Sequence, residues 1–202
     1  MIDSNQIAVA ITGASGAPYS KRLLDVLLNS DLTVHLMISA AGRIVLADEL
    51  DWKLPSRASD IHQHLVDEFK CKPEQLFVYG EQQWTSPLAS GSHHVKTMIV
   101  CPCTMGTLSS IACGSSDNLI NRAADVMIKE NRKLILVPRE APFSAIHLEN
   151  MLKLARIGVC ILPPNPGFYF KPTHLSDIVD FVVARILDQA DIEHTIAPRW
   201  GE

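Results

Sequence analysis

Short aliphatic runs alternate with longer amphipathic stretches along almost the whole chain of 202 residues. The aliphatic runs have no polar face, which is typical of parallel strands that are covered by helices on both sides. The alternation therefore predicts an α/β fold with three layers, doubly wound around a mostly parallel sheet of the Rossmann or flavodoxin-like kind. We expect strands at residues 7–12, 33–38, 75–79, 96–101, 133–137 and 159–162.

Amphipathic stretches between and after these strands predict the helices. We expect them at residues 18–29, 40–50, 105–113, 118–130, 144–156 and 175–189. No linker, internal repeat or low-complexity segment interrupts the pattern. A chain of this length is therefore expected to form a single α/β domain over residues 1–202.

Composition excludes several classes of protein. The chain has 18 Lys and Arg against 22 Asp and Glu, a net charge of −4, whereas a dedicated nucleic-acid binder would show a basic excess. The longest apolar run, residues 7–11, is far shorter than the roughly 20 residues of a membrane span. An odd number of cysteines, five, without a secretion signal predicts reduced thiols and a cytoplasmic protein. No metal site is expected, because Cys101-Pro102-Cys103 lacks zinc-ligand spacing.

Three loops put small or hydroxyl-bearing residues between a strand and a helix. They are Thr12-Gly13-Ala14-Ser15-Gly16-Ala17, Ser39-Ala40-Ala41-Gly42 and Thr104-Met105-Gly106-Thr107. Ligands of open α/β sheets bind beyond the carboxyl ends of the strands, where helix N-termini suit phosphate. Any one loop is explained as well by a tight turn or a helix cap. Together they favour a flat, phosphorylated cofactor.

The missing features narrow the choice of cofactor. The first loop lacks the Gly-Lys-Ser/Thr of a nucleoside-triphosphate site, and only Gly13 and Gly16 fit the dinucleotide-binding pattern. No acidic residue closes the second strand to bind an adenosine ribose. Flavin mononucleotide (FMN), which has one phosphate and no adenosine, fits better than NAD.

Cationic residues on the helix at residues 118–130 leave two readings open. Arg122 and Lys129 are seven residues apart and share a helix face, and Asp125 lies one turn after Arg122. The face is either solvated, with a local ion pair, or a cationic arm for an anion, including one bound by a neighbouring subunit. Spacing alone does not separate these readings.

Two proline-bounded loops follow the fifth and sixth strands. Their sequences are Pro138-Arg139-Glu140-Ala141-Pro142 and Pro166-Gly167-Phe168-Tyr169-Phe170-Lys171-Pro172. The first pins an Arg-Glu pair at the binding edge. In the second, we expect Phe168 and Phe170 to pack into the core, and the Tyr169 hydroxyl to be the functional group.

These segments together resemble the flavin prenyltransferase family (UbiX-type), within the flavin-binding decarboxylase-like superfamily. The most specific block is Thr104-Met105-Gly106-Thr107-Leu108, followed by Asn118-Leu119-Ile120-Asn121-Arg122-Ala123-Ala124-Asp125-Val126. The resemblance also covers residues 12–17, 133–142, 146–154 and 163–172. Related phosphopantothenoylcysteine decarboxylases share the fold but lack the loop at residues 138–142.

The resemblance implies a metal-independent transferase. Such an enzyme moves a dimethylallyl group from dimethylallyl phosphate to N5 and C6 of reduced FMN. The prenylated FMN then serves a UbiD-type decarboxylase, in ubiquinone synthesis or aromatic-acid decarboxylation. The family commonly forms dodecamers. The alternatives are an FMN-dependent decarboxylase of the phosphopantothenoylcysteine type and a non-catalytic, FMN-binding regulatory subunit.

The resemblance also implies roles for particular residues. The FMN contacts would be Gly13, Ala14, Ser15, Ser39, Thr104, Met105, Gly106, Thr107 and Arg139. The prenyl phosphate would be held by Ser90, Arg122, Lys129, Glu140, Tyr169 and Arg185, with Trp84 and Trp200 as aromatic walls. Ser15 would lie near flavin N5, and Glu49 and Glu140 are the candidate acid and base.

Four of these residues are cations that we expect to converge on anions: Arg122, Lys129, Arg139 and Arg185. A chain of this length suffices for one sheet, but we expect neighbouring subunits to complete the site. The C-terminal helix and tail, about residues 175–202, are expected to contribute both to the site and to a homo-oligomer.

Overall fold

The computed structural model describes residues 5–197 and 201. In chain order its strands and helices are β1 (Gln6–Ile11), α1 (Ala17–Leu28), β2 (Thr33–Ile38), α2 (Ala40–Leu50), α3 (Ala58–Phe69), β3 (Leu76–Tyr79), β4 (Thr97–Cys103), α4 (Met105–Cys113), α5 (Leu119–Lys129), β5 (Lys133–Pro138), α6 (Ala145–Arg156), β6 (Cys160–Ile161) and α7 (Leu175–Gln189). Two short 3₁₀ helices, η1 (Pro73–Gln75) and η2 (Pro87–Ala89), lie before and after β3.

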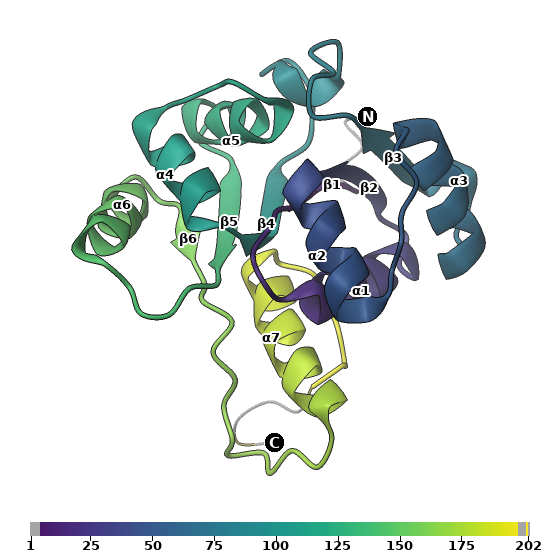
Figure 1. Ribbon diagram of the computed structural model, residues 1–202, viewed down its shortest axis with the longest axis vertical. Coiled ribbons are helices and arrows are strands. Elements are labelled where there is room, and N and C mark those ends of the chain that lie inside the picture. The colour runs from purple at the N-terminus through teal and green to yellow at the C-terminus, as the bar shows by residue number, and fades with distance from the viewer. Residues whose placement is uncertain (1–4, 198–200, 202) are drawn as a thin grey trace.

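The six strands form one sheet in the order β3-β2-β1-β4-β5-β6, and every neighbouring pair is parallel (Figure 1). This is the Rossmann strand order, so the doubly wound α/β prediction is confirmed. The order reverses between β1 and β4, which pair directly, with Ile7 opposite Thr97 and Ala10 opposite Val100. Ligands of such folds bind in the crevice at this reversal, beyond the carboxyl ends of the strands.

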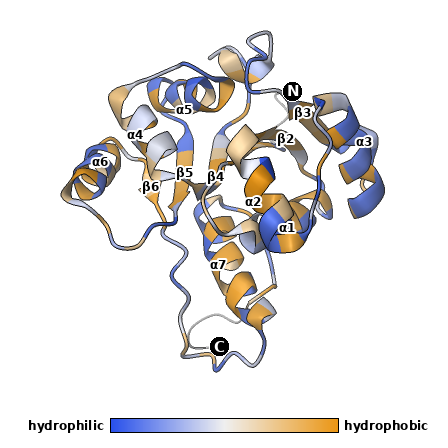
Figure 2. Cartoon of the chain, viewed as in Figure 1, coloured by the Kyte–Doolittle hydropathy of each residue, from blue (hydrophilic) through white to orange (hydrophobic). Residues whose placement is uncertain are grey.

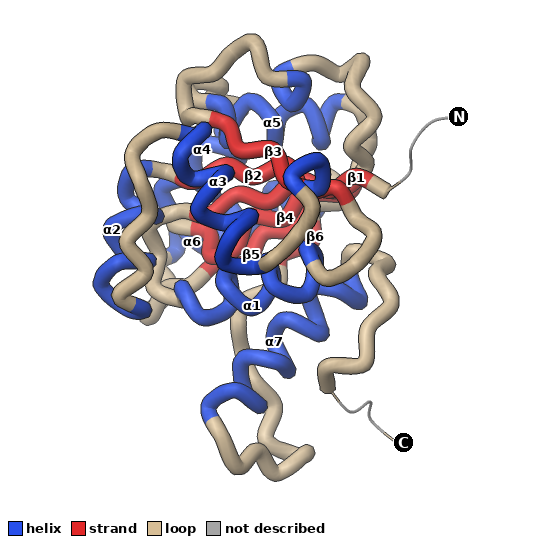
Figure 3. The backbone as a smooth tube through the Cα atoms, turned by 90° about the vertical axis from the view of Figure 1, so that its right-hand side faces the viewer, coloured by secondary structure: helices blue, strands red, loops and turns tan. Residues whose placement is uncertain are grey.

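Helices cover both faces of the sheet (Figure 3). Alternate side chains of a strand point to opposite faces. Val9 therefore packs with α1, α2, α3 and α7, whereas Ala8 and Ala10 pack with α4, α5 and α6. Hydrophobic residues run along much of α7 (Figure 2), which buries its Val183 and Ile186 completely.

Helix α3 was not expected from the sequence. Its buried residues Ile61, Leu65 and Val66 have helical spacing. However, its N-cap, Arg57, makes no side-chain capping bond, and Pro55 lies just before it. The other expected elements are present with ends shifted by a few residues; β4, for example, continues to Cys103.

Helix α7 and the loop before it extend beyond the carboxyl edge of the sheet (Figure 1). The Arg22 guanidinium of α1 donates to Asp180 over 2.6 Å, which ties α7 to the domain. The Phe170 ring stacks on Phe181 of α7, with centroids 5.2 Å apart, but it is only half-buried and lies outside the two core clusters into which it was expected to pack. The same expectation was wrong for Phe168, which is 66% exposed because it lies on the outside of the loop. Among the described residues, no helix combines the length and hydrophobicity of a membrane span.

Candidate active site

The loops after β1 and β4 are joined at the sheet reversal by a single side chain. The Thr12 hydroxyl donates to the Pro102 carbonyl over 2.8 Å and accepts from the Thr104 N–H over 2.9 Å. Thr104 in turn caps α4, because its hydroxyl oxygen accepts from the Thr107 N–H over 3.0 Å. Two of the three loops predicted to bind FMN are therefore held side by side.

The third loop reaches the same place because Gly13 has no side chain. A Cβ on Gly13 would lie 2.5 Å from the Ala41 Cβ, so only glycine permits the start of α2 to come this close. Ser39 caps α2 by accepting from the Gly42 N–H over 2.9 Å. The backbone thus brings residues 13–15, 39 and 104–107 to one edge, as the sequence predicts.

Glu49, on α2, reaches across to the N-terminus of α1. Its Oε2 accepts from the N–H groups of Gly16 and Ala17 over 3.0 and 2.8 Å. Partial burial alone would raise the pKa of Glu49. Hydrogen bonds from the Ser15 hydroxyl and these two N–H groups, together with the nearby Arg139 charge, outweigh burial and lower the pKa below its ordinary value. Glu49 is therefore a carboxylate that can accept a proton, and is poorly suited to supply one.

The three helix N-termini at this edge are not equally available to a ligand. Glu49 occupies that of α1, and the Glu81 carboxylate accepts from Ala40 N–H at the start of α2 over 2.8 Å. At the start of α4, no side chain of the described part of the chain accepts from the N–H groups of Met105 or Gly106. These two groups can therefore donate to oxygen atoms of a bound molecule.

Arg139 and Glu140 lie on the loop between β5 and α6. The Arg139 Nε donates to the Ser15 carbonyl over 3.2 Å, which fixes its guanidinium beside the Ser15–Glu49 pair. The Glu140 carboxylate accepts from the N–H of the next residue, Ala141, over 3.1 Å. Arg139 thus joins the predicted FMN residues, whereas Glu140 stays within its own loop.

A second cluster lies along α5, which runs from Leu119, beside the Glu81 loop near the carboxyl edge, to Lys129 at the amino edge of the sheet. The Arg122 Nε donates to the Ala89 carbonyl over 3.0 Å, beside Ser90, and a Cβ on Gly91 would lie 2.7 Å from the Lys129 Nζ. Ser90 therefore lies between a residue that contacts Arg122 and one that contacts Lys129, although about 10 Å of helix separates the two cations. Strand β4 alone, with seven residues, separates the two edges by about 20 Å. The expected convergence of Arg122, Lys129, Arg139 and Arg185 therefore fails within one chain for Lys129 and Arg139, which lie at opposite ends of β5.

A third group lies along α7. Tyr169 packs against Phe181, with centroids 5.8 Å apart, and Arg185 follows one helical turn later. Arg185 donates to Asp188 over 2.6 Å and lines a pocket of about 450 Å³ between β6 and α7.

The resemblance implies that Trp84 and Trp200 are aromatic walls of the site, and only Trp84 lies within the described residues. Trp84 is 45% exposed on the loop between β3 and β4. Trp200 lies outside the described residues.

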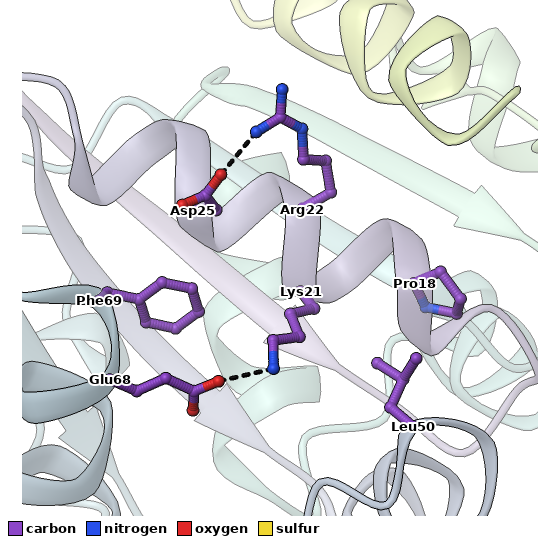
Figure 4. A pocket seen from close by; sticks show the side chains of 7 residues that line it. All are labelled: Pro18, Lys21, Arg22, Asp25, Leu50, Glu68 and Phe69. Carbon is purple, nitrogen blue, oxygen red and sulfur yellow. Dashed lines mark hydrogen bonds and ion pairs between the residues drawn. The ribbon is translucent and has the colours of Figure 1, made fainter. Parts of the chain in front are cut away.

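Another pocket, also of about 450 Å³, opens between α1 and α3 (Figure 4). Its charges are paired with each other, Lys21 with Glu68 and Arg22 with Asp25. None of its lining residues is among those predicted for the site. Within the part of the chain that the structure describes, no group of three His, Cys, Asp or Glu is placed to hold a metal ion.

Sequence reasoning missed two residues that hold the loops of the site. Thr12 joins the β1 and β4 loops, and Glu81 fastens the loop after β3 to the start of α2. No local motif marks Glu81, because its partner lies 41 residues earlier in the chain. Thr12 ends the first strand, so its place at the switch point was a usable signal.

Comparison with known proteins decides the family. The Flavoprotein family matches residues 1–187. Flavin prenyltransferase UbiX of Pseudomonas aeruginosa is 50% identical over 202 residues, which cover all of this chain and 97% of that protein. The chain belongs to the UbiX family of flavin prenyltransferases.

Two solved structures of UbiX relatives share the fold closely. A dodecameric, FMN-dependent UbiX-like decarboxylase from Escherichia coli O157:H7 has a TM-score of 0.86 and 41% identity, covering 98% of this chain and all of that one. AnUbiX (PadA1), in complex with FMN and dimethylallyl pyrophosphate, has a TM-score of 0.87 and 37% identity, covering 98% of each chain.

Proposed function

We propose that this protein transfers a dimethylallyl group from dimethylallyl phosphate to N5 and C6 of reduced FMN, and so makes prenylated FMN for a UbiD-type decarboxylase. The observation that carries the proposal is the 50% identity, over the whole chain, to a flavin prenyltransferase. An FMN-dependent decarboxylase or a regulatory subunit would share the fold, but no observation favours either.

The crevice at the β1–β4 reversal fits FMN. The Met105 and Gly106 N–H groups are available to flavin or phosphate oxygens, and the exposed Gly106 lets a ligand approach the backbone. Gly13, Ala14, Ser15, Ser39, Thr104, Thr107 and Arg139 would complete the contacts. The flavin would supply the nucleophilic nitrogen that displaces phosphate from the prenyl carbon.

The residues around the crevice would transfer protons during the reaction and stabilise the charge of the leaving phosphate. Glu49, held ionised by Gly16 and Ala17, accepts the hydrogen bond of Ser15 and so orients that hydroxyl toward the ligand. We assign Glu49 the part of base, which leaves Glu140 or the released phosphate as the acid. As the prenyl carbon–oxygen bond breaks, cationic side chains stabilise the leaving phosphate by charge-assisted hydrogen bonds.

Those cations must come from another copy of the chain if they act at the FMN crevice. Lys129 lies about 20 Å from the crevice of its own chain, at the other end of the sheet. We therefore propose a homo-oligomer, dodecameric like the E. coli relative, in which one copy supplies the crevice and another supplies Ser90, Arg122 and Lys129. Tyr169, Arg185 and the tail to residue 202 would reach a neighbouring site in the same way.

Helix α6 offers a surface for such a contact. Its outer face, defined by Ala145, Leu148, Leu152 and Ala155, is exposed although apolar, with Leu148 53% and Leu152 50% exposed. The face follows directly on the Arg139–Glu140 loop, so a copy that packs there stands beside the crevice. Large exposed apolar patches of this kind mark interaction sites.

Replacing Leu148 and Leu152 together by Glu is expected to shift the protein from its oligomer to smaller species, measured by size-exclusion chromatography with light scattering. Each leucine buried at a contact contributes about 1.5–3 kcal/mol. Lys153→Glu, which adds negative charge to α6 outside the outer face, is the control and should leave the mass unchanged. An intact oligomer in the double variant would exclude this face as the contact.

A direct test of the activity is anaerobic incubation with reduced FMN and dimethylallyl phosphate, followed by mass spectrometry of the flavin. We expect the flavin to gain the mass of one prenyl unit. An unchanged flavin mass with folded, FMN-bound protein would refute the proposed function.

A cytoplasmic location is also part of the proposal. It is supported by the cysteines, all five of which are unpaired in the structure. Thiols remain reduced in that compartment.

A further inference from the structure

The loop that carries Ser90 is held by few hydrogen bonds between its own residues. Ser90 and Ser92 share a hydrogen bond between their hydroxyls, 2.8 Å long, and the His93 N–H donates to the Ser90 carbonyl over 3.3 Å. We call residues 89–95 the serine loop. Such loop contacts are exposed to water and open easily, so the position of Ser90 depends on what holds the loop from outside.

Arg132 holds the serine loop at two points. Its Nη2 donates to the Gly91 carbonyl over 2.5 Å, and its Nη1 donates to the Val95 carbonyl over 3.2 Å. Arg132 is half-buried, immediately after the C-terminal turn of α5, where its own N–H donates to the Met127 carbonyl over 2.8 Å. One guanidinium therefore ties the middle and the C-terminal end of the serine loop to the turn that follows α5, while Arg122 holds the first residue of the loop through the Ala89 carbonyl.

The loop also lies directly against Lys129. The ammonium of Lys129 forms an ion pair with Glu130, and the backbone of Gly91 packs on this pair. A Cβ on Gly91 would lie 2.7 Å from the Lys129 Nζ, so the backbone of the serine loop and the end of the Lys129 side chain are in close contact. The separation between the Ser90 hydroxyl and the Lys129 ammonium is thus set by how the loop is clamped.

We propose that Arg132 is a positioning residue for the prenyl phosphate: by bridging the Gly91 and Val95 carbonyls it fixes Ser90 and Lys129 as one anion-binding unit. The inference rests on the proposed function. The planar fork of arginine suits the role, because a lysine ammonium is a point charge that cannot bridge two separated carbonyls in the same way. Arg132 directs one N–H of each terminal nitrogen at the loop, and in this role it need not touch the phosphate.

The test compares Arg132→Gln and Arg132→Lys in the full-length protein. Losing hydrogen bonds from a charged donor is expected to raise the KM for dimethylallyl phosphate about 10–100-fold in Arg132→Gln. The kcat should fall less, and FMN affinity and oligomer mass should stay as in the wild type. Arg132→Lys keeps the charge but not the planar fork, so its KM should remain nearly as high as that of Arg132→Gln. Arg57→Gln removes an exposed arginine near β3 and controls for net charge.

Hydrogen exchange of the backbone amides of residues 89–95 separates this inference from the proposed function. Faster exchange in Arg132→Gln, together with the raised KM, supports the clamp. A normal KM in Arg132→Gln, or full recovery in Arg132→Lys, overturns it. A wild-type protein that prenylates no FMN refutes the proposed function, whereas unchanged exchange in Arg132→Gln refutes the clamp itself.

Discussion

Replacing Lys129 by alanine is expected to lower the prenylation rate about 10²–10³-fold, the usual loss when one preorganised charge contact to a transition state is removed. FMN affinity should change little, because the Lys129 ammonium is assigned to the phosphate of the prenyl donor, whereas FMN is held by the crevice residues at the carboxyl edge of the sheet. Single-turnover kinetics with preformed reduced FMN complex would measure the rate, and flavin fluorescence the affinity.

The control for Lys129→Ala is Lys72→Ala, which removes an exposed ammonium from the turn before β3. Its rate should match that of the wild type. A Lys129→Ala protein that prenylates FMN at the wild-type rate would show that this ammonium is not a phosphate ligand. A parallel loss of FMN affinity would mean that Lys129 acts on the flavin and not on the prenyl donor.

Substitutions of Glu49 should separate its two tasks. Glu49→Gln keeps an oxygen for the Gly16 and Ala17 N–H groups but cannot take up a proton, so we expect near-normal FMN binding and a rate lower by about 10²-fold or more. Glu49→Ala removes the acceptor as well and should also weaken FMN binding. Full activity in Glu49→Gln, assayed by flavin mass, would exclude Glu49 as the base.

The pH dependence follows from the lowered pKa of Glu49. A base acts in its ionised form, so the rate should hold as the pH falls until the pH passes below the ordinary range of a glutamate. Glu49→Gln should lose this acid limb. Because the folded-state pKa lies below the unfolded one, Glu49 also stabilises the fold at neutral pH, and this contribution disappears as the pH falls through the lowered pKa.

Much of the fold follows from the sequence because the interiors of the strands buried on both faces are apolar, with the exception of His35 in β2. The runs that form β1, β2, β4 and β5 are of this kind, and their carboxyl ends mark the crevice. The loops at residues 13–15 and 104–107 were found by the same rule. Helix α3 was missed, although Ile61, Leu65 and Val66 carried a helical period, because Pro55 and the poor cap obscured its start.

The contacts between loops are less accessible to sequence reasoning. Glu49 meets Gly16 across 33 residues, and only the pairing of β1 with β2 brings them together. The lowered pKa of Glu49 depends on that meeting. By contrast, the sequence does separate Lys129 from Arg139, because the strand predicted at residues 133–137 lies between them and puts them at its two ends.

The central claim is that the prenyl phosphate and the FMN of one active site are held by different copies of the chain. Lys129→Ala is defective in the cationic half, and Arg139→Ala is defective in the crevice. An oligomer made only of one variant should be nearly inactive, because every site then contains the same defective half. In a mixed oligomer, however, some sites would draw an intact half from each variant.

The most direct measurement is the prenylation rate of oligomers co-expressed from these two variants, purified through two different affinity tags. If the subunits mix at random, about a quarter of the sites combine two intact halves, so activity should return to about that share of the wild type. Separately purified oligomers, combined without subunit exchange, should stay inactive. Mixed oligomers that are no more active than the two variants would contradict the account, because each site would then be complete within one chain.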